Sequence, residues 1–120
     1  MTNGEREAIK ACQFHDITEG DVAFALELAD AYRRDARSSI DGLIRSLAEN
    51  DRETGKKKAH ALKGSSANIG AAPLRDLAVE MEAALEAGAW RDVDILLAGI
   101  QREFDRADKA LRALTDSMPS

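Results

Sequence analysis

Cysteine, proline and long apolar runs are scarce in this chain of 120 residues, which contains one cysteine and two prolines. A single cysteine, Cys12, excludes an internal disulfide and fits a reducing cytoplasm. No apolar run approaches the ~20 residues that a bilayer-spanning helix needs, and the first residues lack the apolar core of a signal peptide. We therefore expect a cytoplasmic protein that does not insert into a membrane.

Several motifs for binding and catalysis are also missing. The sequence contains no G-x-x-x-x-G-K-[ST] loop, so it offers no means of binding a nucleotide and making its own phosphoryl donor. Its formal net charge of −5 argues against a nucleic-acid partner held through phosphate contacts. Cys12 and His15 lack the further ligands of a zinc site, and neither His15 nor His60 follows a glutamate by three residues, as a di-iron bundle would require. We expect no bound metal and no cofactor.

Helical periodicity is the strongest positive signal in the sequence. Apolar residues make up 44% and charged residues 32%, the balance of a soluble globular protein. The length suits one domain over residues 1–120, with a core at about residues 19–115. Four long segments within it repeat apolar residues with a helical period. The sequence predicts an all-α fold, an antiparallel four-helix bundle with a short extra N-terminal helix at residues 5–13, and a monomer is expected.

The first long helix is expected at about residues 19–49. Residues His15 to Thr18 are interpreted as the connection before it, and either Thr18 or Asp21 is expected to cap its start. The apolar pattern keeps its phase through Gly42, which favours one long helix over two and allows a bend at the glycine. Its core stripe is predicted to comprise Val22, Ala25, Leu26, Ala29, Tyr32, Ala36, Ile40, Leu43, Ile44 and Leu47.

Turn and cap residues divide the rest of the chain. Asp51 is expected to cap a helix that Gly70 ends, since glycine tolerates the left-handed conformation found after a helix. Pro73 fits the first turn of the next helix, where its missing N–H costs nothing, and Gly88 ends that helix. A last helix is predicted to begin near Trp90.

The helix that carries His60 has an unusual outward face. At 100° per residue, one narrow core face is formed by Gly55, Ala59, Leu62, Ser66 and Ile69. His60 lies nearly opposite this face and is predicted to point to solvent. Its neighbours one and two turns away are predicted to be Lys56, Lys57, Lys63, Gly64 and Ala67.

This arrangement suits nucleophilic chemistry on the imidazole. An exposed imidazole is available as a neutral nucleophile near pH 7, and the nearby lysines favour an anion beside it. Ser65 and Ser66 lack an acidic residue beside His60 in the way a catalytic triad requires, and Ser66 is expected to allow close helix packing in the core. His60 taken alone would fit an ordinary exposed histidine on a charged helix.

The run from His60 to Ala71, HALKGSSANIGA, resembles the signature of histidine-containing phosphotransfer (Hpt) domains. That pattern is a histidine, two residues, Lys-Gly-Ser/Ala, and a Gly-Ala pair after the helix. The resemblance extends over most of the chain, including the long first and last bundle helices and the Ala-Gly-x-Trp turn at residues 87–90. One departure is Ala89, where relatives often carry an aspartate that caps the last helix.

The resemblance implies a phosphorelay intermediate in two-component signal transduction. His60 would accept a phosphoryl group from an aspartate of one response-regulator receiver domain and pass it to an aspartate of another. Lys63 would steady the phosphoryl group and Gly64 would leave room for the partner, which brings its own Mg²⁺. Such a protein has no ATP-dependent kinase activity of its own, and a hybrid sensor kinase is a further candidate partner.

Two other functions compete with this hypothesis. The chain could be a helical interaction module that docks a signalling protein without transferring phosphate, or a scaffold fragment of a longer chain. Neither would need the histidine, lysine and glycine together, so the relay is favoured.

A second apolar strip on the first long helix also requires an explanation. The strip consists of Phe24, Leu28 and Ala31. Phe24 and Leu28 are candidates for the partner-docking surface. The N-terminal segment could instead cover the strip through Ile9, Phe14 or Ile17, and both explanations stay open.

Overall fold

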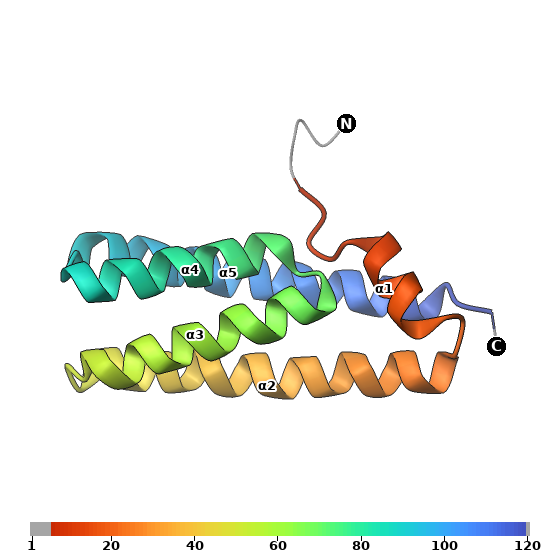
Figure 1. Ribbon diagram of the computed structural model, residues 1–120, viewed down its shortest axis with the longest axis horizontal. Coiled ribbons are helices and arrows are strands. Elements are labelled where there is room, and N and C mark those ends of the chain that lie inside the picture. Colours follow the sequence, from red (N-terminus) through yellow and green to blue (C-terminus); the bar gives the residue numbers. More distant parts are fainter. Residues whose placement is uncertain (1–5, 120) are drawn as a thin grey trace.

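The computed structural model describes residues 6–119, which form five α-helices. Their bounds are α1 Ala11–Thr18, α2 Val22–Ala48, α3 Arg52–Ile69, α4 Ala72–Ala87 and α5 Trp90–Asp116. Helices α2 to α5 form an antiparallel bundle in which each helix packs on its neighbour in the chain and α5 closes the ring against α2 (Figure 1). The predicted all-α four-helix bundle with an extra N-terminal helix is confirmed.

The predicted caps and turns account for most helix boundaries. Asp21 accepts a hydrogen bond from the Phe24 N–H at 3.0 Å at the start of α2, and Asp51 accepts one from the Thr54 N–H at 3.1 Å at the start of α3. Gly70 ends α3 with a φ of 88°. Ala89 precedes α5 without a side-chain cap, which is the departure that the sequence indicated.

The N-terminal helix differs from the prediction. It was expected at residues 5–13, of which residue 5 lies outside the described range, with a connection from His15 to Thr18. Instead α1 begins at Ala11 and runs through that connection to Thr18. The Lys10 N–H donates to the Gly70 carbonyl at 2.9 Å, which ties the preceding backbone to the end of α3. Thr18 is buried and donates to the Phe14 carbonyl, so it does not cap α2.

Helix α1 lies across the end of the bundle where α3 stops and the longer α2 and α5 continue (Figure 1). The Gln13 side-chain amide donates to the Ala67 carbonyl at 3.0 Å and lies 3.3 Å from the Asn68 carbonyl. These two carbonyls are among the last in α3, which have no partner within the helix. Helix α1 therefore stabilises the C-terminal end of the helix that carries His60.

The long helix α2 is continuous through Gly42. The prediction that its core stripe includes Leu26 and Ile44 was wrong. Leu26 and Ile44 are exposed, whereas Ser39 and Ser46 are buried. A Cβ added at Gly55 of α3 would lie 3.7 Å from the Ser46 Cβ. The glycine and the serine let α2 and α3 approach closely there, which accounts for the burial of Ser46.

Candidate functional site

His60 lies in the middle of α3, and 64% of its side chain is exposed. Its chain neighbour Ala59 and the nearby Leu62 are fully buried in the core and fix that face of the helix. The predicted outward direction of the imidazole is confirmed. The ring is therefore accessible to a protein partner while the helix that holds it is anchored by packing.

Glu82 of α4 is the residue that the sequence analysis missed. Both of its carboxylate oxygens lie 3.4 Å from the His60 Nδ1, and its Oε1 lies 3.7 Å from the Lys63 Nζ. From the sequence, an acidic residue beside His60 was considered only as part of a triad with Ser65 or Ser66, and this contact was not identified. The two residues are 22 positions apart and meet only because α3 and α4 pack together. When the Nδ1 carries the ring proton, it can donate to Glu82, which leaves the Nε2 lone pair free.

The lysines near His60 are in the predicted positions, but two of them have acidic partners. Lys56 Nζ lies 2.7 Å from Glu86 and 3.3 Å from Glu53, and its hydrogen bond to Glu86 raises the pKa of Lys56. The same contact lowers the pKa of Glu86. Lys63 shares Glu82 with His60. The charges of Lys56 and Lys63 are therefore partly balanced in the free protein, whereas no ion pair is found for Lys57 within residues 6–119.

Open space lies next to the imidazole, as the small residues predicted. A Cβ added at Gly64 would meet nothing within 4 Å, and Ala67 is exposed. A shallow depression of about 260 Å³ lies beside the ring and is lined by Glu53, Lys56, Lys57, His60 and Glu82. This face can accept another protein without clashing with the side chains of α3.

A buried hydrogen bond supports the site from the opposite side of α3. The Ser66 side chain is fully buried, as predicted, and its Oγ lies 2.9 Å from the Tyr32 hydroxyl of α2. Burial raises the pKa of Tyr32 to about 12. The pair fixes α3 against α2 and thereby holds the direction in which His60 points.

The second apolar strip of α2 is only partly covered. Leu28 packs against the core as a half-buried residue, whereas 41% of Phe24 remains exposed in the first turn of α2. Phe14 of α1 is fully buried, so the N-terminal segment does contribute to the core. The role of Phe24 and Leu28 in partner docking stays a prediction.

Within residues 6–119, no three histidine, cysteine or acidic side chains are placed to hold a metal ion. Cys12 is exposed, and its thiol forms no disulfide. None of the helices in this range combines the length and apolar character that a membrane span requires.

Comparisons with known proteins agree with this geometry. The sequence model of the Hpt domain family matches residues 27–113. A crystal structure of histidine-containing phosphotransfer protein B (HptB) from Pseudomonas aeruginosa PAO1 superposes with a TM-score of 0.85 at 20% identity, over 93% of this chain and 97% of that one. At this identity the superposition shows a common fold. No curated protein matches the chain. Because the family match spans most of the bundle, the chain belongs to the Hpt domain family and serves histidine phosphotransfer in two-component phosphorelay.

Proposed function

We propose that His60 is the residue that carries the phosphoryl group between receiver-domain aspartates. The observation that carries this proposal is an exposed imidazole that contacts Glu82 through its Nδ1 and has open space at Gly64. The other histidine, His15, lies in α1 and has no such surroundings among the described contacts. His15 therefore serves as the matched control.

The transfer step follows from the position of the ring nitrogens. The Nε2 lone pair attacks the phosphorus of the receiver's aspartyl phosphate, an N–P bond forms, and the P–O bond to the aspartate breaks. The aspartate leaves as a carboxylate, and the ring gains positive charge while Nδ1 keeps its proton. Glu82, 3.4 Å from Nδ1, stabilises that charge. Passage to a second receiver reverses these steps.

Lys63 and Gly64 have separate roles in this proposal. The Lys63 ammonium lies 3.7 Å from Glu82 in the free protein and is expected to turn to a phosphoryl oxygen when the group arrives. Gly64 lets the receiver surface approach the ring. The Mg²⁺ that balances the phosphoryl charge belongs to the receiver domain, so the chain itself supplies position and hydrogen bonds.

The proposed partners are two classes of receiver domain, one that donates the phosphoryl group and one that accepts it. Hpt proteins interact with receiver domains of response regulators, and the Lys57, Gly64 and Ala67 surface beside His60 is the proposed contact. The protein is proposed to act in the cytoplasm as a monomer, and the free thiol of Cys12 fits a reducing compartment.

Incubation with a phosphorylated receiver domain tests the site. Acid-labile phosphate is expected on the wild type and on His15→Gln, and none is expected on His60→Gln. Equal labelling of wild type and His60→Gln would reject the assignment. A wild type that binds the receiver without gaining phosphate would instead indicate an interaction module.

A further inference from the structure

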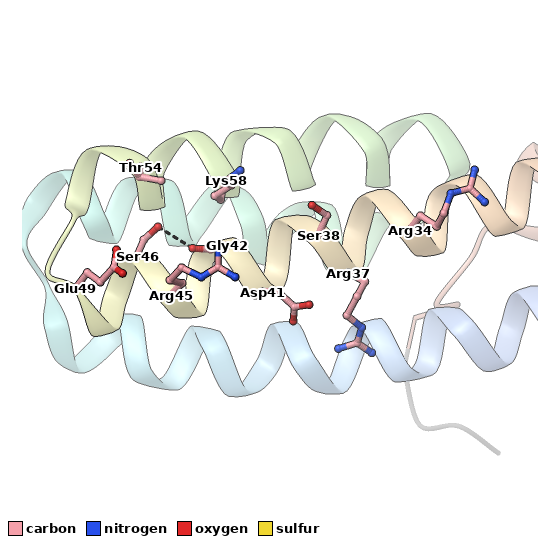
Figure 2. Close-up of a pocket in the computed structure, with 10 residues that line it drawn as sticks. All are labelled: Arg34, Arg37, Ser38, Asp41, Gly42, Arg45, Ser46, Glu49, Thr54 and Lys58. Carbon is pink, nitrogen blue, oxygen red and sulfur yellow. Dashed lines mark hydrogen bonds between the residues drawn. The ribbon is translucent and has the colours of Figure 1, made fainter.

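A groove of about 530 Å³ lies along α2 and α3, on the side of α3 away from α4 (Figure 2). Lys58 lines it from α3, and two residues of helix correspond to a rotation of about 200°, so Lys58 faces away from His60. The groove carries four basic side chains and two acidic ones. These are Arg34, Arg37, Arg45 and Lys58, with Asp41 and Glu49.

The cations of this groove differ from Lys56 and Lys63 near His60, which have acidic partners. Within residues 6–119, no ion pair is found for Arg34, Arg45 or Lys58. An excess of positive charge in one groove is unexpected in a chain with a net charge of −5. An anionic occupant would balance this excess of positive charge.

Two of the basic side chains are held in place by specific contacts. A Cβ added at Gly42 would come within 2.8 Å of the Lys58 Cε and 2.9 Å of its Cδ, so the missing side chain makes room for the stem of Lys58. A glycine inside a long helix costs ~1 kcal/mol relative to alanine. The Arg37 guanidinium lies 4.6 Å from the centre of the Phe104 ring of α5, a cation–π contact that leaves its N–H edges available.

We propose that this groove binds an acidic segment of a partner protein, independently of phosphoryl transfer at His60. Arg34 and Arg45 are separated by eleven positions, about 16 Å along α2. An extended segment of roughly five residues covers that distance. Carboxylates at its two ends would meet the two arginines, and Lys58 and Arg37 lie between them.

A nucleic acid fits the groove less well. Asp41 and Glu49 would repel a continuous row of phosphates, and no aromatic ring lines the groove for base stacking. An acidic peptide can place neutral residues or lysines opposite these two carboxylates. The charge pattern therefore favours a peptide of mixed sequence with acidic residues near its ends.

Fluorescence anisotropy with a labelled octapeptide that carries two glutamates at each end and four serines between them tests the proposal on the full chain. Arg34→Glu/Arg45→Glu is expected to weaken binding by about tenfold or more, and added salt to weaken wild-type binding. Arg91→Glu/Lys109→Glu is the control, because it changes the net charge equally on the exposed face of α5. Equal weakening by both double variants, or no wild-type binding at low salt, would overturn the proposal.

Three further measurements sharpen the result. Gly42→Ala keeps every charge but displaces the flexible end of Lys58, so peptide binding is expected to weaken by about threefold while the fold is retained. Unchanged affinity would overturn the role of Lys58. His60→Gln is expected to bind the peptide like the wild type, which separates this site from the phosphorelay. Tighter binding of an octathymidylate strand through the same arginines would overturn the choice of a peptide.

Discussion

The two flanks of α3 differ in whether their basic side chains have acidic partners. On the flank that faces α4, Lys56 lies against Glu86 and Glu53, and Lys63 lies near Glu82. On the flank that faces α2, Lys58 extends over Gly42 beside arginines that have no ion pair among the described residues. The first flank carries His60 and two lysines with acidic partners, whereas the cations of the second flank have none among the described residues.

Under the two proposals above, charge near His60 serves the transfer step, and charge in the groove serves association. A lysine that is already paired gains less from an arriving phosphoryl group, so the group can also leave. An unpaired arginine attracts its partner at longer range. A relay intermediate needs the first property, since it must both accept and release the phosphoryl group.

The largest effect is expected at the buried contact between α3 and α2. The folded protein raises the pKa of Tyr32 from an ordinary value of 10.0 to about 12 through burial. Below pH 10 the tyrosine keeps its proton in both the folded and the unfolded chain. It therefore makes no pH-dependent contribution to the free energy of unfolding in that range. Between pH 10 and 12 only the unfolded chain releases the proton, and stability falls by about 2–3 kcal/mol.

Urea unfolding of the wild type and of Tyr32→Phe from pH 9 to 12 measures this effect. The lysines titrate in the same range in both proteins, so the difference between the two free energies of unfolding isolates the contribution of Tyr32. Tyr32 is the only tyrosine, so tyrosinate absorbance reports its titration directly. Equal loss of stability in both proteins would contradict the prediction. The exposed contacts between α3 and α4 are not expected to change the free energy of unfolding by a comparable amount over this pH range.

The second prediction tests whether the receiver covers only the His60 flank. Gly64→Gln is expected to lower transfer from a phosphorylated receiver by about tenfold or more, because a long side chain enters the open space beside the ring. The helix itself should become more stable by roughly 0.5–1 kcal/mol, since glutamine is a better helix former than glycine. Receiver-dependent labelling and thermal unfolding measure the two effects separately.

Phosphoramidate, a small phosphoryl donor, is the control for Gly64→Gln because it needs no docking surface and should still label His60. Ala61→Gln is the matched variant, since Ala61 is exposed toward the α2 flank and borders a depression there. Transfer in that variant is expected to equal that of the wild type. A comparable loss with Ala61→Gln would mean that the receiver covers both flanks.

The third prediction separates the hydrogen bond of Glu82 from its charge. Glu82→Ala removes the acceptor for Nδ1 and is expected to slow transfer onto His60 by about three- to tenfold, the range of one hydrogen bond. Glu82→Gln keeps an oxygen that can accept from Nδ1 but removes the negative charge that stabilises the positively charged ring, so its rate is expected to lie between those of Glu82→Ala and the wild type. Single-turnover labelling compares the three proteins, and equal slowing in both variants would show that the charge is required.

Local sequence signals were sufficient for the four helices of the bundle and for the direction of His60. Asp51 and Gly70 mark the ends of α3 because a cap and a left-handed glycine act within a few residues. The position of α1 could not be predicted, since the Lys10 to Gly70 hydrogen bond joins distant parts of the chain. Glu82 was missed for the same reason, because its contact with His60 also joins distant parts of the chain. The apolar period of residues 72–87 places Glu82 beside the core face of α4, but it does not show which helix packs next to it.

The smallest effect is expected at Lys56, which the sequence alone suggested as a phosphate-attracting residue. Its amine is 2.7 Å from Glu86, and that carboxylate keeps the pKa of Lys56 raised. Lys56→Gln is therefore expected to change receiver-dependent labelling by less than about twofold, whereas Lys63→Gln lowers it more strongly, because Lys63 lies one turn after His60 and its contact with Glu82 is longer, at 3.7 Å. Labelling rates at low and moderate salt measure both variants. A loss with Lys56→Gln as large as that with Lys63→Gln would mean that Lys56 leaves Glu86 when the receiver docks, and the charge of Lys56 would then be available during transfer.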